Sequence, residues 1–282
     1  MRTSRDTSAS QVANNIRVHD QIAKQYERVH GEIYNDIEQM RLRSSLTRAL
    51  SFVQTNGESK LALDFGCGAG NLTKHITSLG CDVLACDISQ GFLDLVASRQ
   101  YPASVKTVRL NGSDLSNIPD ATVDMVATYS VLHHVPDYLG ILAEFVRVLK
   151  PGGIVFIDHE ASAEVWQPTP ERLAFLGAMG NAVGSRWRKY FRPRNYLDWF
   201  IWNFVDPRYR PEGDIHVFKD DHIEWDRVAA VLESSGAEIV AEEDYLLFRR
   251  GFDESVYERF RHQTADIHLI MAKKLEEPDP EQ

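Results

Sequence analysis

The fold of this chain is decided by the stretch Leu61-Ala62-Leu63-Asp64-Phe65-Gly66-Cys67-Gly68-Ala69-Gly70. A short apolar run that leads straight into glycines is typical of a buried parallel strand. Glycines at the carboxyl end of such a strand let the backbone turn sharply and approach a ligand closely. The stretch therefore predicts the first strand of an open α/β sheet, with a binding turn at its end.

Strands and helices alternate after this stretch. Further strands are expected at 83–86, 105–110, 123–129 and 154–157, with helices at 72–79, 92–98 and 138–149 between them. A helix at 223–232 and two closing strands at 239–248 and 267–273 follow later in the chain. Strands that alternate with helices imply βαβ units, and hence a parallel sheet with right-handed crossovers.

The remaining segments set the domain organisation. Residues 1–14 are polar and are expected to be disordered. Two helices are expected within 15–57, one from Ile16 to about Val29 and one capped by Asn35. Residues 58–160 form the core, 161–217 are an insertion rich in Trp, Arg and Pro, 218–275 complete the core, and 276–282 are a tail.

Composition limits the classes of partner. The net charge is −10, and no basic stripe is present of the kind that binds nucleic acid. The spacing of Cys67, Cys81 and Cys86 suggests neither disulfides nor a zinc site, so we expect reduced thiols and no metal. A secretory signal and a run of about 20 apolar residues are both missing. We therefore expect a soluble, cytoplasmic protein without stable membrane insertion.

The glycine-rich turn could serve a dinucleotide or S-adenosylmethionine. Its spacing is GxGxG, and Asp64 stands two residues before the first glycine. A nearby carboxylate would repel a pyrophosphate, whereas it would attract a sulfonium that carries an ammonium group. Asp64 therefore favours S-adenosylmethionine, and a purely structural turn in another Rossmann-like protein is the alternative.

Three further polar groups follow predicted strands. Asp87 ends the second strand about 20 residues beyond the glycines, where a carboxylate can accept hydrogen bonds from both hydroxyls of a ribose. The alternative role of Asp87 is to cap the following helix, a role that Ser89 could fill instead. Asp114 follows the third strand and could bind an adenine amino group or simply form a turn. His133 and His134 follow the fourth strand and are expected to face the cleft.

These motifs occur in an order and spacing that resemble a known family. The chain is similar to the class I, Rossmann-like S-adenosylmethionine-dependent methyltransferases, in particular the small-molecule group of the ubiquinone- and menaquinone-biosynthesis type. Four stretches carry the resemblance, namely 61–70, 83–89, 112–119 and 123–153. It covers residues 15–160 well, the tail from about 215 loosely, and the insertion not at all.

The resemblance implies a fold and a set of site residues. It implies a seven-stranded, mostly parallel sheet with helices on both faces, the last strand antiparallel, and an N-terminal helical cap over the cofactor. At the methionine part of the cofactor it implies contacts from Asp64, Gly66 and Gly68, with Ser130 and His133 near the methionine end. At the ribose and adenine it implies contacts from Asp87 and Ile88, and at the adenine from Asp114 and Leu115. In the cap it implies a contact from Tyr26, with Tyr34 as a further candidate.

Methyl transfer is an in-line displacement, so the acceptor atom must be aligned and often deprotonated. Histidine suits the role of general base near neutral pH. The candidates are His133, His134, His159 and His216, of which His133 and His216 are favoured. Each of these histidines could instead be structural.

The insertion bears on the substrate. Its aromatic stretch, residues 196–204, is expected to form a lid that lines an apolar acceptor pocket. A homodimer interface and a membrane surface are the alternatives. Five basic residues between 186 and 194 could meet an acidic group or form a solvated face.

The sequence thus predicts methyl transfer from S-adenosylmethionine to O, N or C of a small molecule, with S-adenosylhomocysteine as product. Oxygen of a hydroxylated aromatic or lipid-like acceptor is favoured. A dinucleotide-dependent oxidoreductase and a non-catalytic S-adenosylmethionine-binding module are the alternatives.

Overall fold

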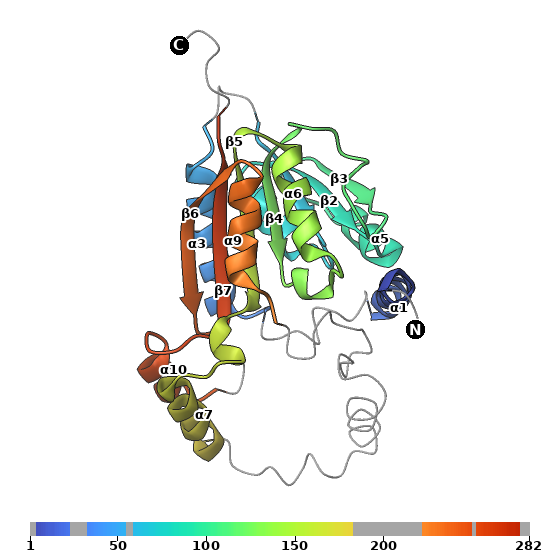
Figure 1. The fold of residues 1–282 in the computed structure, drawn as a ribbon. Helices are drawn as coiled ribbons and strands as arrows, with labels where there is room; N and C mark the ends of the chain where they lie inside the picture. Colours follow the sequence, from blue (N-terminus) through green and yellow to red (C-terminus); the bar gives the residue numbers. More distant parts are fainter. Residues whose placement is uncertain (1–3, 23–32, 55–58, 183–221, 250–251, 277–282) are drawn as a thin grey trace.

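The computed structural model describes residues 4–22, 33–54, 59–182, 222–249 and 252–276. Seven strands form one sheet in the order β3-β2-β1-β4-β5-β7-β6 (Figure 1). Pairing is parallel from β3 through β5, and β7 runs antiparallel to both β5 and β6. The predicted Rossmann-like sheet with an antiparallel last strand is confirmed.

The strands lie where the alternating sequence predicts them. Their bounds are β1 Leu61–Phe65, β2 Asp82–Asp87, β3 Val105–Arg109, β4 Val123–Tyr129, β5 Leu149–Ala161, β6 Ala237–Tyr245 and β7 Ile267–Lys274. One prediction differs: β5 already begins at Leu149, so Pro151-Gly152-Gly153 lies inside this strand and not in a loop before it. Lys150 and Asp124 pair across β5 and β4 at this point.

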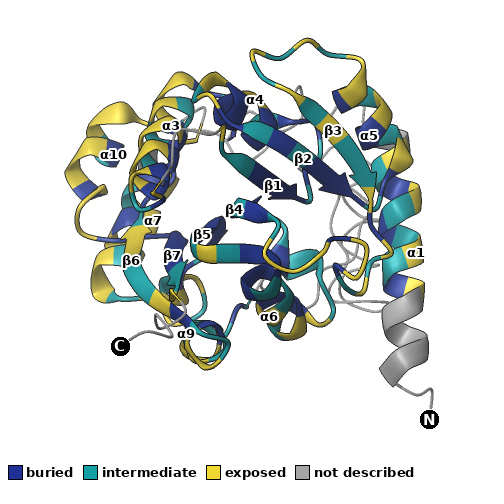
Figure 2. Cartoon of the chain, turned by 90° about the horizontal axis from the view of Figure 1, so that it is seen from above, coloured by how far each residue is buried: buried dark blue, intermediate teal, exposed yellow. Residues whose placement is uncertain are grey.

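The helices cover both faces of the sheet (Figure 2). Their bounds are α1 Ser4–Ile22, α3 Asp36–Ser51, α4 Asn71–Ser78, α5 Gln90–Ala97, α6 Tyr138–Val148, α7 Pro170–Ala182, α9 Trp225–Ser234 and α10 Glu254–Phe260. Asn35 caps α3 as predicted, because its side chain accepts from the Glu38 N–H at 3.1 Å. The short helix α10, which Asp253 caps, was not predicted.

Two hydrophobic layers hold these helices on the sheet. One layer packs α6 and α9 against one face, with the fully buried Phe145 and Leu142 among its members. The other packs α3 and α4 against the opposite face through Leu42, Leu46 and Ile76. The central strands β1, β4, β5 and β7 are largely buried on both sides, which explains their mostly apolar sequences, whereas the edge strands β3 and β6 are partly exposed and more polar.

The N-terminus departs from the prediction. Residues 1–14 were expected to be disordered and a helix to begin near Ile16, but α1 begins at Ser4 and ends at Ile22. The hydrophobic periodicity of this helix is weak because the face of α1 that lines the pocket includes the polar residues Asn15 and His19. Such a helix is stabilised by tertiary contacts and not by an apolar stripe.

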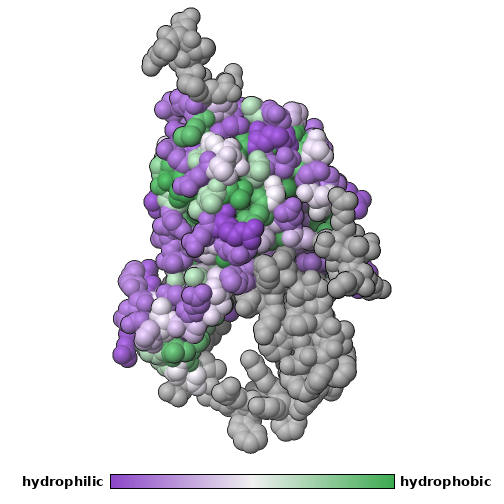
Figure 3. Space-filling model, viewed as in Figure 1, coloured by the Kyte–Doolittle hydropathy of each residue, from purple (hydrophilic) through white to green (hydrophobic). Residues whose placement is uncertain are grey.

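Much of the insertion lies outside the described residues. The described part contains α7, whose Phe175 and Met179 pack with Tyr257 and Phe260 of α10. Leu173 and Leu176 of α7 are exposed, and hydrophobic surface is visible at this corner in Figure 3. The predicted lid and dimer interface at 196–204, the basic residues between 186 and 194, and His216 fall outside the description. No helix in the described ranges is long and apolar enough to cross a membrane.

Candidate functional site

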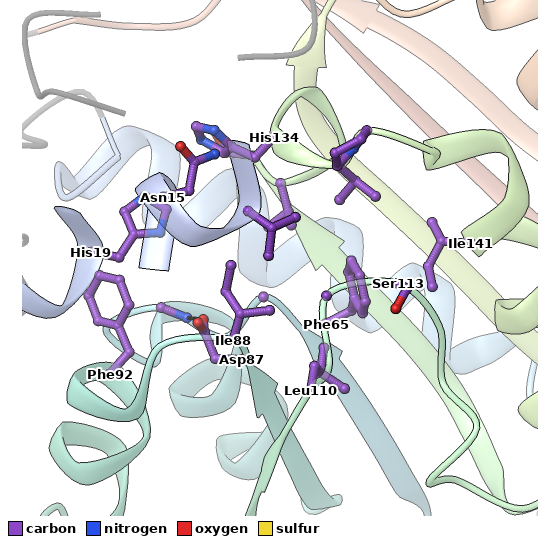
Figure 4. A pocket seen from close by; sticks show the side chains of 18 of the residues that line it. Asn15, His19, Phe65, Asp87, Ile88, Phe92, Leu110, Ser113, His134 and Ile141 are labelled. Carbon is purple, nitrogen blue, oxygen red and sulfur yellow. Dashed lines mark hydrogen bonds between the residues drawn. The ribbon is translucent and has the colours of Figure 1, made fainter. Parts of the chain in front are cut away.

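A pocket lies at the carboxyl ends of β1, β2, β3 and β4, with α1 covering one side (Figure 4). In open α/β sheets this edge is where ligands bind. The strand ends contribute the polar groups and the predicted turn glycines, whereas Phe65, Ile88 and Leu110 supply apolar walls. Of the predicted site residues, the lining includes Gly66, Gly68, Asp87, Ile88, Asp114 and Ser130.

The glycine turn has a backbone that only glycine adopts easily. Gly66, Gly68 and Gly70 have φ values of +70°, +47° and +82°. A Cβ on Gly66 would lie 2.6 Å from both methyl groups of Val131, so a side chain there would collide with the loop after β4. The turn therefore lies close against this loop and leaves the space beyond the strand ends open.

Most backbone N–H groups of this turn are already used inside the protein. Gly66 and Cys67 both donate to the Cys86 carbonyl at 2.9 Å, Gly68 donates to Asp87 Oδ2 at 2.9 Å, and Gly70 donates to the Cys67 carbonyl at 2.8 Å. A pyrophosphate-binding turn needs such groups for its ligand. These four donors are committed, so the turn is poorly suited to a dinucleotide.

Asp87 stands at the end of β2 and is only 5% exposed. Its two oxygens accept from the N–H groups of Gly68 and Ser89, at 2.9 and 2.8 Å, which fixes the carboxyl group at the pocket. Burial raises its pKa, and these hydrogen bonds act against the rise. Ser89 caps α5 by accepting from the Phe92 N–H. Asp87 is therefore not needed as the cap, and its oxygens keep lone pairs for ligand hydroxyls.

Asp64 is placed differently from the prediction that it surrounds a ligand. It is fully buried beneath the glycine turn, is not among the lining residues, and accepts from Thr73 Oγ1 at 2.6 Å. Burial raises the pKa of Asp64 to about 7. Electrostatic attraction of a cationic ligand by Asp64 therefore depends on its protonation state, and its direct role remains a prediction.

The residues after β3 are divided between the pocket and the core. Asp114 lines the pocket, but its Oδ1 accepts from Asn111 and Ser116, as a turn-forming aspartate does. Leu115 is fully buried, and its N–H donates to Glu144 Oε2 at 3.1 Å. The predicted contact of Leu115 with an adenine therefore has no support in the pocket lining.

Glu160, at the end of β5, organises the loop after β4. Its Oε1 accepts from the N–H groups of Val131 and Leu132, both at 2.7 Å, and its Oε2 lies 2.7 Å from His133 Nδ1. His133 thus turns toward Glu160, while His134 lines the pocket. Sequence reasoning gave Glu160 no role, although its position at a strand end beside His159 was a usable signal.

Helix α1 closes the pocket opposite the strand ends. Val12, Asn15 and His19 line the cavity, and the His19 ring lies 5.6 Å from that of His134 (Figure 4). Asp20 fixes the helix, because its Oδ1 accepts from Ser89 Oγ at 2.5 Å and from the Gly91 N–H at 3.0 Å. Sequence reasoning missed these residues. The predicted cap residue Tyr26 lies outside the described part, and Tyr34 packs with the core layer of α3.

Comparison with known proteins finds methyltransferases. Residues 63–157 match the family model of a methyltransferase domain. The ubiquinone biosynthesis O-methyltransferase of Methylococcus capsulatus is 32% identical over 113 residues, which is 39% of this chain and 48% of that protein. The demethylmenaquinone methyltransferase of Thermobifida fusca is 35% identical over 130 residues, 45% of this chain and 53% of that protein. The chain therefore spans about half the length of the curated relatives it matches.

Solved structures share the fold. An S-adenosylmethionine-dependent methyltransferase from Methanosarcina mazei matches with a TM-score of 0.52 and 22% identity, over 80% of this chain and 96% of that one. The cyclase SpnF matches with a TM-score of 0.56 and 16% identity, over 94% of this chain and 96% of that one. At such identities the likeness concerns the fold alone, and the same fold serves more than one chemistry.

Proposed function

We propose that this chain is a class I, Rossmann-like S-adenosylmethionine-dependent methyltransferase and that it transfers a methyl group to an oxygen of a hydroxylated small molecule. The observation that carries the proposal is the pocket at four strand ends, with the buried Asp87 carboxyl on one side and the glycine turn beside it. The relatives named above methylate small molecules by their names, which supports this substrate class.

The residues present fit the cofactor. Asp87 would accept from the ribose hydroxyls, Ile88 and Asp114 would flank the adenine, and Gly66 and Gly68 leave room for the methionine part. The pocket is also narrow where a flat ring would lie, because a Cβ on Gly112 would come within 2.8 Å of Val12. S-adenosylmethionine, when bound, supplies a methyl group on a positively charged sulfur.

We assign the proton transfer to His133. The Glu160 carboxylate beside Nδ1 favours the tautomer with the proton on that nitrogen, which makes Nε2 the basic nitrogen of the ring. Such a pair suits an acceptor that must lose a proton, as a phenolic hydroxyl does when its oxygen is methylated. This favours oxygen over carbon as the methylated atom.

The alternatives have less support. A dinucleotide would need N–H groups that Gly66, Cys67, Gly68 and Gly70 already use. In a non-catalytic binding module Glu160 would only hold the loop after β4, and its contact with His133 Nδ1 would serve no purpose. The predicted role of residues 161–217 as a lid over the acceptor stays part of this proposal.

Calorimetry with S-adenosylmethionine, S-adenosylhomocysteine and NAD tests the cofactor assignment. We expect both sulfur ligands to bind and NAD not to bind. Asp87→Asn, which keeps the side-chain volume and one acceptor oxygen, should weaken sulfur-ligand binding about tenfold or more, since hydrogen bonds to a charged group are lost. Asp94→Asn on the exposed face of α5 is the matched control. Preference for NAD would contradict the proposal.

A further inference from the structure

Helix α7 lies in a part of the molecule that the proposed reaction does not use. Together with α10 it lies on the opposite side of the molecule from α1 and the pocket (Figure 1, Figure 2). No side chain from Leu173 to Gly180 is polar. A helix that is apolar all round is normally buried on every side, whereas α7 lies at the surface.

The inner face of α7 is fully explained by contacts within the chain. Phe175 and Met179 are buried in a cluster with Phe260 of α10, and the rings of Phe175 and Phe260 lie 5.8 Å apart. Arg172 Nη1 donates to the Ala265 carbonyl at 2.9 Å. These contacts fix α7 on the body of the protein, so its outer face keeps one orientation.

The outer face of α7 consists of two leucines followed by two glycines. Leu173 is 57% exposed and Leu176 is 50% exposed, and hydrophobic surface is visible at α7 in Figure 3. Gly177 and Gly180 are exposed as well. Because residues three and four apart are neighbours on a helix, these four residues form one continuous stripe.

The two glycines have no explanation inside the chain. Glycine in the interior of a helix is destabilising relative to alanine. A Cβ at Gly177 or at Gly180 would have no described atom within 4 Å, so packing within the described residues does not require glycine at either position. A second surface that approaches the helix backbone closely would require it.

The order of residues along the stripe is complementary to itself. A twofold axis placed midway between Leu176 and Gly177, perpendicular to α7, relates two antiparallel copies of the helix. Leu176 of each copy then faces Gly177 of the other, and Leu173 faces Gly180. Each leucine enters the space that a glycine leaves, which is how self-complementary interfaces of twofold dimers are built.

We propose that α7 is the interface of a homodimer, in which two copies of this chain pair their α7 helices antiparallel. The chain has a net charge of −10, and the uncharged stripe lets two copies meet without like charges in contact. The 13 residues of α7 span only about 20 Å. Such a contact is smaller than a standard interface, so we expect a weak dimer with a dissociation constant of about 10–100 µM.

Sedimentation equilibrium of the full chain between about 1 and 200 µM tests the dimer. Gly177→Gln is the main variant, because glutamine favours the helix and should keep or raise the melting temperature. Its side chain would collide with Leu176 of the other copy, so we expect the dissociation constant to rise at least tenfold. Leu176→Gln should weaken the dimer likewise. Ala174→Gln, on the exposed flank of α7, is the matched control and should change the constant less than twofold.

Cysteine cross-linking tests the antiparallel register. A mixture of Leu173→Cys and Gly180→Cys chains should form a disulfide between the two variants under mild oxidation. Leu173→Cys alone should not, because the two copies of residue 173 lie about 10 Å apart along the helix axis, beyond the reach of a disulfide. The native cysteines are buried and do not compete.

Three results would overturn the proposal. One is a wild type that stays monomeric over the whole concentration range, and another is a Gly177→Gln dimer as strong as that of the wild type. The third is a monomeric wild type whose melting temperature falls in Gly177→Gln, since the face would then be covered by the same chain and not by a second copy. The proposal does not depend on the reaction that the chain catalyses.

Discussion

Glu160 is the residue on which the loop after β4 depends, since it accepts from two backbone N–H groups and orients His133. Glu160→Gln keeps its size and an acceptor oxygen but removes the charge that stabilises a protonated His133. We expect the single-turnover rate of methyl transfer to catechol to fall about 100-fold, in the range that general bases contribute. Binding of S-adenosylhomocysteine should stay unchanged.

The control for this substitution is Glu171→Gln, on the exposed side of α7. His133→Gln should lose a similar factor, and the double variant little more, because the two residues act as a unit. Wild-type rates in Glu160→Gln would show that the pair is structural.

Asp64 makes the free energy of unfolding depend on pH. Its pKa is about 7 when folded, against an ordinary value of 3.8. Between these values the folded chain keeps a proton that the unfolded chain has lost, so this contribution to stability is present at low pH and disappears as the pH rises to 7. Asp64→Asn, which cannot ionise, should lack this dependence.

Urea unfolding at about pH 5.5 and pH 7.5 measures the effect. Relative to Asp64→Asn, the wild type should lose about 2 kcal/mol of unfolding free energy between these conditions, at 1.36 kcal/mol for each unit of pH over the affected range. The difference between the variants isolates Asp64 from other groups, such as His75, whose pKa is lowered to about 4 by burial. Parallel pH profiles of the two proteins would contradict the assignment.

At the scale of elements, α1 is held over the pocket by a small number of contacts. Asp20 accepts from Ser89 Oγ and the Gly91 N–H at the start of α5, and the close approach leaves little room, since a Cβ on Gly91 would lie 3.2 Å from the Asp20 Cα. We expect Asp20→Ala to weaken S-adenosylhomocysteine binding about tenfold, because the helix that closes the pocket loses two hydrogen bonds.

Hydrogen exchange of the amides in residues 10–22 checks this prediction directly. Exchange should be faster in Asp20→Ala than in the wild type, and addition of S-adenosylhomocysteine should slow it in both proteins. Arg17→Ala, on the exposed face of the same helix, is the matched control. Unchanged exchange and affinity in Asp20→Ala would show that α1 is held by other contacts.

At the scale of the whole molecule, the pocket depends on the core layer beneath it. Phe145 of α6 is fully buried, and its ring packs edge-on against the pocket residue Phe65 at 4.9 Å between centroids. Phe145→Ala should lower the unfolding free energy by about 3–5 kcal/mol, because it creates a cavity between α6 and β1. Phe145→Leu, which fills most of the space, should cost less than half as much.

Urea unfolding followed by circular dichroism measures both variants. A loss below about 1 kcal/mol in Phe145→Ala would mean that the layer collapses into the cavity. Binding of S-adenosylhomocysteine to the folded fraction then shows whether the substitution also displaces Phe65, which lines the pocket.

The sequence by itself determined the order of the elements and the edge where the site lies. Parallel strands buried on both faces read as apolar runs, and the turns after them carry glycines and aspartates whatever the rest of the chain does. The stretch from Leu61 to Gly70, the caps Asn35 and Ser89, and the position of Asp87 could all be predicted for this reason. They depend on local backbone geometry, which nearby residues specify.

The tertiary structure alone decided what each polar group does. Asp64 is buried with a raised pKa, His133 turns toward Glu160 while its neighbour His134 lines the pocket, and His159 takes a left-handed backbone conformation and stacks on Tyr129. Helix α1, which the sequence predicted as partly disordered, closes the pocket through Asp20. Burial and hydrogen bonding at these positions come from residues far away in the sequence, such as Glu160 for His133 and Ser89 for Asp20. Only the packed fold brings these groups together, because contacts at that separation are set by how strands and helices pack and not by local pattern.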